Sequence, residues 1–216
     1  MKNILIVGAG GFIAQELKAD FERQGFTVLR TSRSKSSNAL YLDLNDPDCV
    51  ENFVAPVDKL HAIVFAQGIK PTQNLRTMTH QHFLNMLGVH LMGPSLLLKK
   101  LLPLCEKHAL VLFFSSVAVR KGSYDPSYAA AKAGILGLIQ SLQNEFPEQR
   151  FNAISLGLVE GSPVYQGMSE EFRQKHRSHM HSQSLIHVAN VVTLTNELLR
   201  NNSISRSVLP LDGGYS

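Results

Sequence analysis

The chain has 216 residues, a formal net charge of +4 and a pI near 9.1, with 44% apolar and 18% charged residues. These values predict one globular domain, residues 1–216, with a sizeable hydrophobic core, and they exclude a disordered chain. The basic residues are scattered, which argues against nucleic-acid binding, and no apolar run is long enough to cross a membrane.

The two cysteines and the N-terminus bear on the compartment. Cys49 and Cys105 have neither CxxC nor metal-binding spacing, as expected of ordinary thiols in a reducing compartment. The apolar start has a single lysine, is interrupted by glycines and lacks a small-residue cleavage site. It therefore predicts a first strand rather than a signal peptide, and we expect a cytoplasmic protein.

Apolar runs of strand length alternate with amphipathic helical patterns along the whole chain. Strands are expected at residues 3–7, 26–30, 41–44, 61–66, 110–115, 150–155 and 207–210. Helices are expected at 12–24, after the Asp46-Pro47 cap, and at 78–107, 126–146 and 186–200, whereas 163–184 is polar and rich in histidine. This alternation predicts an α/β fold with a doubly wound parallel sheet of about seven strands flanked by helices.

The turn after the first expected strand is rich in glycine. Gly8, Gly10 and Gly11 lie there, and Phe12 and Ile13 open the next helix. Glycines let the backbone approach a pyrophosphate, and a helix N-terminus supplies free N–H groups to it. The context favours a dinucleotide site, and the alternative is merely a tight strand–helix turn.

The end of the second expected strand indicates which dinucleotide binds. Sites for NAD usually place an acidic residue there to bind the ribose 2′-hydroxyl, but this chain has Arg33 and no acid. A guanidinium pairs with a 2′-phosphate, so NADP(H) is favoured over NAD(H). The alternative is a solvated basic loop. Asp43, at the end of the third strand, could accept from the adenine amino group or could be a capping or turn carboxylate.

A serine, tyrosine and lysine pattern, S-S-x(11)-Y-A-A-A-K, lies further along the chain. Asp125-Pro126 predicts the start of a helix that places Tyr128 and Lys132 on one face. A nearby ammonium would lower the pKa of the phenol, so Tyr128 could act as a general acid or base. Ser116 could bond to the same substrate oxygen. The alternative is a surface Tyr/Lys pair on an alanine-rich helix.

With these motifs the chain resembles the short-chain dehydrogenase/reductase family almost from end to end, down to the LPLDGGYS ending. The resemblance implies a Rossmann-type sheet, hydride transfer between a nicotinamide and a carbonyl/alcohol substrate, and a homodimer or homotetramer. It implies a variable substrate loop at about 160–184 and catalytic roles for Ser116, Tyr128 and Lys132. The cofactor contacts that it implies are Gly8, Gly11, Asp43, Ala66, Gln67, Gly68, Lys132, Gly157 and Val159.

The chain departs from the family pattern at several positions. His90 stands where the family usually has an asparagine that supports a water chain to the lysine, so it is either a relay residue or a polar core residue. Ala66-Gln67 replaces Asn-Ala, and Leu156 replaces a proline. Ser115 has the more usual spacing to Tyr128, whereas the strand end and the following Val-Ala favour Ser116 as the catalytic serine.

Three histidines, His176, His179 and His181, raise the question of a metal site. Their spacing fits no familiar site and no cysteine or carboxylate cluster is adjacent, so a polar lid is favoured over a metal site. The loop does not identify the substrate.

The sequence thus predicts an NADP(H)-dependent oxidoreductase. The alternatives are an NADP(H)-binding regulatory protein without turnover, which His90, Gln67 and Leu156 favour, and a nucleotide-sugar epimerase or dehydratase, which the G-x-x-G-x-x-A spacing suggests.

Overall fold

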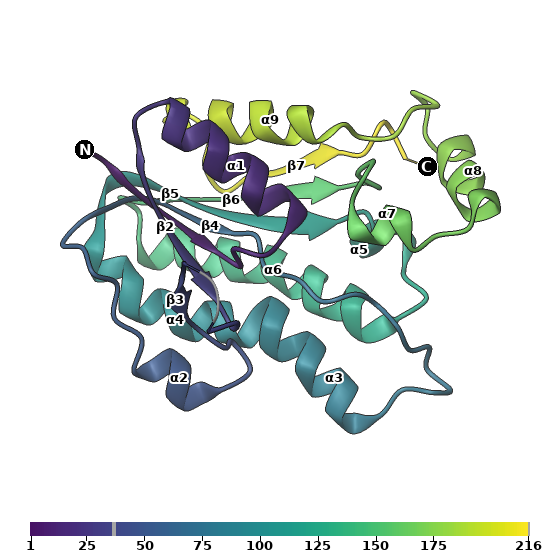
Figure 1. The fold of residues 1–216 in the computed structure, drawn as a ribbon, viewed down its shortest axis with the longest axis horizontal. Helices are drawn as coiled ribbons and strands as arrows, with labels where there is room; N and C mark the ends of the chain where they lie inside the picture. The colour runs from purple at the N-terminus through teal and green to yellow at the C-terminus, as the bar shows by residue number, and fades with distance from the viewer. Residues whose placement is uncertain (36–37, 216) are drawn as a thin grey trace.

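The computed structural model describes residues 1–35 and 38–215, which form a seven-stranded sheet with helices on both faces (Figure 1). The strand order is β3-β2-β1-β4-β5-β6-β7, and every neighbouring pair is parallel. The predicted doubly wound parallel sheet is confirmed. Because the chain moves outward from β1 on one side and returns to β4 on the other, a crevice is expected where β1 and β4 end.

The strands agree with the predicted order and differ in length. They are β1 (Asn3–Val7), β2 (Thr27–Ser32), β3 (Leu40–Tyr41), β4 (Leu60–Phe65), β5 (Cys105–Ser116), β6 (Arg150–Leu156) and β7 (Val208–Leu211). The third strand was predicted at 41–44 but ends at Tyr41. The chain then turns, since the amides of Asn45 and Asp46 bond to the side chain and carbonyl of Asp43.

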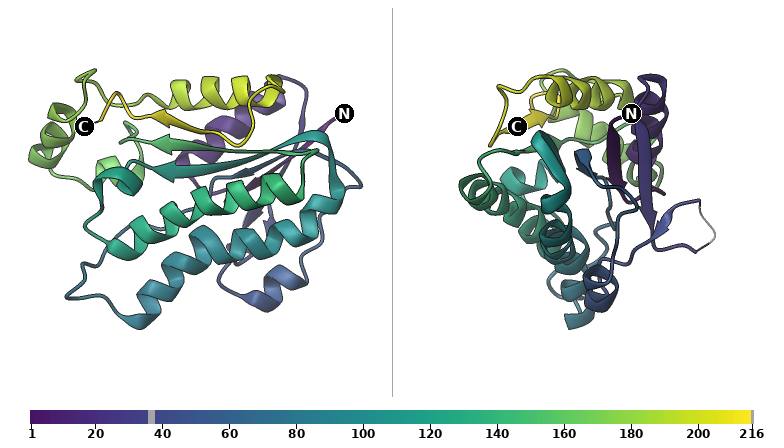
Figure 2. Two further views of the ribbon diagram at one scale, coloured as in Figure 1. Left: turned by 180° about the vertical axis from the view of Figure 1, so that it is seen from behind. Right: turned by 90° about the vertical axis from the view of Figure 1, so that its left-hand side faces the viewer.

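Helices cover both faces of the sheet, as Figures 1 and 2 show. They are α1 (Phe12–Arg23), α2 (Pro47–Glu51), α3 (His80–Leu87), α4 (Gly93–Leu101), α5 (Ala118–Lys121), α6 (Pro126–Glu145), α7 (Pro163–Gln166), α8 (Glu170–Ser178) and α9 (Val188–Arg200). Helices α1 and α9 lie on one face, and α3, α4 and α6 on the other. Two buried apolar clusters follow, one around Phe21 and Ile154 and one around Phe65 and Phe113.

The helix predicted over 78–107 is not continuous. A π-helical turn, η1 (Gly88–Met92), separates α3 from α4, and after a 3₁₀ turn, η2 (Leu102–Leu104), residues 105–107 already belong to β5. The two glycines that bound η1 explain the break. A Cβ at Gly88 would collide with Asn45 and a Cβ at Gly93 with Leu44, so the helix is pressed against the β3–α2 connection. Such π-turns are frequent at functional sites, and this one carries His90.

The polar segment 163–184 contains two helices that the sequence pattern did not predict. Ser162 and Ser169 cap α7 and α8 by accepting from the amides of Tyr165 and Phe172. Both helices lie at the end of the molecule toward which β5 and β6 run (Figure 1). In the part of the chain that the structure describes, no helix is long and apolar enough to span a membrane.

Candidate active site

The glycine turn between β1 and α1 approaches the β4 end too closely for a side chain. Gly8 has φ +95°, and a Cβ there would lie 2.5 Å from the Cα of Gln67. Gly11 is the N-cap of α1, and the first turn of α1 has no acidic residue. The first amides of α1 therefore have no side-chain cap, which is the arrangement that binds a phosphate.

A cavity of about 550 Å³ extends from this turn to Tyr128. Its size is that of an ordinary ligand site. The predicted site residues that line it are Gly8, Gly10, Gly11, Phe12, Ile13, Arg33, Asp43, Ala66, Gln67, Gly68, His90 and Tyr128. The structure therefore brings the glycine turn, the β2 end, the β4 end and the tyrosine to one continuous cavity.

Four predicted site residues do not line this cavity: Gly157, Val159, Ser116 and Lys132. Gly157 packs against the backbone of Asp212, and Val159 is buried. The wall there is formed instead by Ser162, Pro163 and Val164, of which Pro163 and Val164 were not expected from the sequence. A serine followed by a proline is a helix-start pattern, and it could have indicated an element at this place.

Arg33 and Asp43 lie in the wall of this cavity and differ in their surroundings. Arg33 is exposed. One carboxylate oxygen of Asp43 accepts from the amide of Asn45 at 2.9 Å, so this side chain is both a turn residue and a cavity residue.

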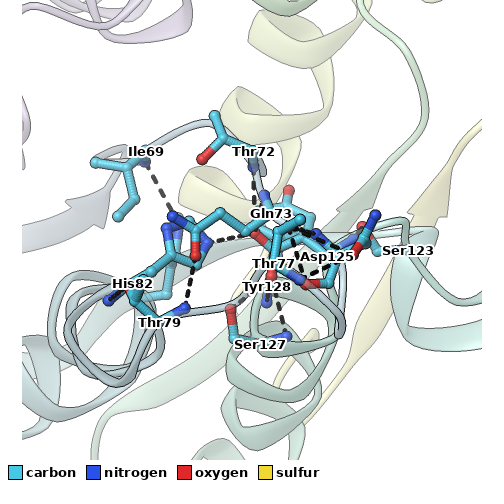
Figure 3. A network of polar contacts seen from close by, with 12 residues as sticks. Ile69, Thr72, Gln73, Thr77, Thr79, His82, Ser123, Asp125, Ser127 and Tyr128 are labelled. Carbon is cyan, nitrogen blue, oxygen red and sulfur yellow. Dashed lines mark hydrogen bonds and ion pairs between the residues drawn. The ribbon is translucent and has the colours of Figure 1, made fainter.

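Tyr128 lies in the first turn of α6, and Asp125 caps that helix by accepting from the amides of Ser127 and Tyr128 (Figure 3). Burial raises the pKa of the Tyr128 phenol above its ordinary value, and a hydrogen bond with Ser116 opposes part of that rise. The neighbouring Ser115 points elsewhere, since its hydroxyl donates to the carbonyl of Lys132 at 3.3 Å. Of the two serines, Ser116 is therefore the one beside the phenol.

Lys132 is buried one turn after Tyr128. Its Nζ donates to the carbonyl of Phe114 at 2.6 Å and lies 5.8 Å from the centre of the Tyr128 ring. Burial lowers the pKa of this lysine to about 7. The expectation that Lys132 lowers the pKa of Tyr128 is wrong for this structure, because the ammonium is directed at a carbonyl and desolvation of the phenol dominates.

His90 is buried against Tyr128, and the two rings meet edge to face with centres 5.4 Å apart. Its Nε2 accepts from the amide of Ile69 at 3.4 Å. Burial, with a contribution from Lys132, holds the pKa of His90 well below its ordinary value, so the ring is neutral. Since Nε2 is the acceptor, the proton belongs on Nδ1. Nδ1 is buried and has no hydrogen-bond partner among the described residues.

The residues present fit a bound dinucleotide. The Oε1 of Gln67, in the cavity wall, is buried without a hydrogen-bond partner in residues 1–35 and 38–215, while its Nε2 donates to the carbonyl of Val89. An unpartnered buried acceptor indicates that a donor group completes the site. Together with the uncapped start of α1 and the exposed guanidinium of Arg33, it matches the amide, phosphate and ribose groups of such a ligand.

Comparison with known proteins identifies the family. A family model described as "Enoyl-(Acyl carrier protein) reductase" matches residues 13–216. The chain belongs to the short-chain dehydrogenase/reductase family. Members transfer a hydride between a nicotinamide and a CH–OH or C=O group, so this chain is an NAD(P)-dependent oxidoreductase.

Curated family members and solved structures agree with this assignment. The chain is 23% identical to a 3-oxoacyl-[acyl-carrier-protein] reductase MabA of Mycobacterium tuberculosis, over 96% of this chain and 88% of the relative, and 22% identical to MabA of Mycobacterium avium, over 96% and 85%. A family member from Brucella melitensis superimposes with a TM-score of 0.86 at 18% identity, over 99% of this chain and 95% of that one. A small-chain dehydrogenase solved with NADPH has a TM-score of 0.86 at 20% identity, over 99% and 97%.

The histidines of the polar segment contact the C-terminal tail. The rings of His176 and His179 lie 5.7 and 5.6 Å from the ring of Tyr215. Within the described residues, no group of three or more His, Cys, Asp and Glu side chains is arranged to hold a metal ion.

Proposed function

We propose that this protein is an NADP(H)-dependent reductase of a carbonyl substrate in which Tyr128 donates the proton. The observation that carries the proposal is that Tyr128 lines the same cavity as the uncapped start of α1. A proton donor and a dinucleotide cradle in one cavity are what hydride transfer to a carbonyl requires.

The Tyr128 phenol is in the protonated form that reduction of a carbonyl requires. A phenol whose pKa lies above its ordinary value is protonated at neutral pH and is therefore ready to donate. The hydroxyl of Ser116 accepts from the amide of Ala118 at 3.2 Å and is hydrogen-bonded to the Tyr128 phenol, and we propose that both hydroxyls bond to the same substrate oxygen. The two hydroxyls would stabilise the negative charge that develops there. The bound nicotinamide supplies the hydride.

We propose that Lys132 and His90 return a proton to the Tyr128 phenol after the phenol has donated its own. Lys132 has a pKa of about 7, so it exchanges protons readily at neutral pH. Beside the ring of Tyr128, His90 has an Nδ1–H without a partner in the part of the chain that the structure describes. A water on that nitrogen would give His90 the role that the family asparagine performs.

Preference for NADP(H) is supported by the β2 end. Arg33 is exposed at the cavity and no acidic residue follows β2. Two solved structures with similar folds contain the phosphorylated cofactor: the small-chain dehydrogenase holds NADPH, and a protein named ElxO holds NADP. The homodimer or homotetramer and the cytoplasmic location remain predictions from the sequence.

The test is a screen for turnover that follows NADPH absorbance with simple ketones, 3-oxoacyl thioesters, sugars and quinones. The 3-oxoacyl thioesters are included because curated relatives are named for that substrate class. We expect at least one carbonyl to be reduced by the parent protein and not by Tyr128→Phe. Tight NADPH binding without turnover of any carbonyl or alcohol would favour the regulatory alternative.

A further inference from the structure

A buried carboxylate joins three elements next to the cavity. Asp125 is fully buried at the start of α6 and contacts both the connection after β4 and helix α3 (Figure 3). Hydrogen bonds from these surroundings hold the pKa of Asp125 at about 2 against the opposing effect of burial, so this side chain is an anion. A buried anion persists only when donors surround it.

The two carboxylate oxygens of Asp125 serve different parts of the molecule. Oδ1 accepts from the amides of Ser127 and Tyr128 at 3.1 and 3.2 Å and from the Ser127 hydroxyl at 2.5 Å. These bonds cap α6, a task that a serine or asparagine also performs. Oδ2 instead accepts from the amides of Thr72 and Gln73 at 3.2 and 3.5 Å and bonds to the Nε2 of His82 at 2.6 Å. The second set is not needed to begin the helix.

The bonds to Oδ2 fix a segment that forms one wall of the cavity. Ile69, Lys70 and Pro71 line the cavity. At one end of this segment the amide of Ile69 bonds to His90, which contacts Tyr128. At the other end the amides of Thr72 and Gln73 bond to Asp125. Hydrogen bonds therefore hold both ends of this wall segment. The residues that make these bonds, His90 and Asp125, both contact the first turn of α6, which carries Tyr128.

His82 bonds to Asp125 from α3. It lies in the first turn of α3, where Thr79 caps the helix by accepting from the amide of His82. The His82 side chain is 12% exposed. Its Nε2 donates to Asp125 at the start of α6, the helix that packs against α3. The amide of Thr79 bonds in turn to the side chain of Gln73 at 2.8 Å, so α3 and the wall segment hold each other.

We propose that His82 and Asp125 are a positioning pair that sets the distance between the wall segment 69–73 and Tyr128, and so determines how tightly the carbonyl substrate binds. This inference rests on the proposed function. Within the described residues neither His82 nor Asp125 lies in the wall of the cavity that holds the glycine turn and Arg33, so we expect cofactor affinity to change less than substrate affinity.

The experiment compares two variants at His82, one at Asp125 and a control variant at His80. His82→Leu removes the donor, and His82→Gln keeps a donor near the position of Nε2. Loss of a hydrogen bond to a charged group should raise KM for the accepted carbonyl about tenfold in His82→Leu. Turnover at saturating substrate and the Kd for NADPH should stay within about twofold, and His82→Gln should recover most of the KM.

Backbone hydrogen exchange supplies a readout that needs no substrate. In His82→Leu the amides of Thr72 and Gln73 should exchange about tenfold faster, because His82 no longer holds their acceptor, the carboxylate of Asp125, in place. Asp125→Ser keeps a cap for α6 but has no Oδ2, so it should show the same faster exchange with α6 intact by circular dichroism. The matched control is His80→Leu, an exposed histidine on the same helix, which should behave like the parent.

The outcomes separate this inference from the proposed function. If the parent accepts no carbonyl, the proposed function fails, and the exchange rates alone decide whether the pair holds the wall. Unchanged exchange at Thr72 and Gln73 in His82→Leu overturns the inference. Equal KM in parent and His82→Leu, or equal impairment of His82→Leu and His82→Gln, overturns it as well.

Discussion

The ring of His90 meets the ring of Tyr128 edge to face, with centres 5.4 Å apart, and the Nε2 of His90 accepts from the amide of Ile69. This contact places a neutral imidazole, whose Nδ1–H has no partner in residues 1–35 and 38–215, where the family usually has an asparagine. If Nδ1 holds a water of the proton relay, His90→Asn should keep or raise turnover, since an amide also bonds to water. His90→Leu should lower turnover with the fold intact, measured by steady-state rates and thermal unfolding. Both variants behaving like the parent would make His90 a packing residue.

Arg33 should decide between the two nicotinamide cofactors. NADPH should bind more tightly than NADH, and Arg33→Ala should remove much of the difference, because one charged hydrogen-bonded contact is worth about ten- to a hundredfold in affinity. The measurement is the Kd of each cofactor by fluorescence titration. Lys35→Ala removes an equal charge from an exposed residue that does not line the cavity, and it should leave the difference intact. Equal affinities of the parent for both cofactors would contradict the assignment.

Lys132 should make the stability of the cofactor-free protein depend on pH. The folded-state pKa of about 7 lies below that of an unfolded lysine, so above pH 7 the unfolded chain binds more protons than the native one. The free energy of unfolding should therefore rise between about pH 7 and pH 8.5, by up to about 1.4 kcal/mol per pH unit. Urea titrations should show this rise in the parent and a flatter dependence in Lys132→Met. A parallel dependence in the two proteins would mean that Lys132 stays charged when folded.

Gly8 should be intolerant of a side chain for two independent reasons. Its φ is +95°, and a Cβ would lie 2.5 Å from the Cα of Gln67, which is backbone and cannot move aside cheaply. Gly8→Ala should therefore destabilise the fold by about 1–3 kcal/mol or more. Gly10→Ala is the matched control, because no atom of the described residues lies within 4 Å of a Cβ there. Its unfolding midpoint should stay near that of the parent, and equal midpoints for both variants would count against the steric argument.

The succession of strands along the chain and the glycine-turn part of the cavity could be predicted because both follow from local patterns. Apolar runs mark the buried strands, and the glycine turn lies immediately after the first of them. The break at Gly88 could not be predicted, because residues 78–107 have helical propensity throughout and the break arises from packing against Asn45 and Leu44. The local sequence pattern indicates which secondary structure a segment favours. It does not indicate which residues pack against that segment in the folded protein.

The electrostatics of the site were the least predictable part. The Tyr128–Lys132 spacing suggests a phenol with a lowered pKa, but the depth of burial reverses the direction of the shift. The Asp125-Pro126 pattern correctly predicts a helix cap through Oδ1. The partners of Oδ2 come from 43 to 53 residues away in the chain, and only the folded structure brings them together.

The proton donor is tested by the smallest change in the site. Tyr128→Phe removes one oxygen and keeps the ring, so the edge contact with His90, the fold and NADPH affinity should change little. Turnover should fall by about 10²–10⁴-fold, because a general acid typically contributes that much. Single-turnover oxidation of NADPH with the accepted carbonyl gives the rate of the chemical step directly. Ser116→Ala should cause a smaller loss, since it removes one of the two hydroxyls that we propose bond to the substrate oxygen. Because the pKa of the phenol is raised, reduction by the parent should persist above neutral pH and decline only as the phenol ionises. A Tyr128→Phe protein that reduces the carbonyl at the parent rate would remove Tyr128 from the mechanism.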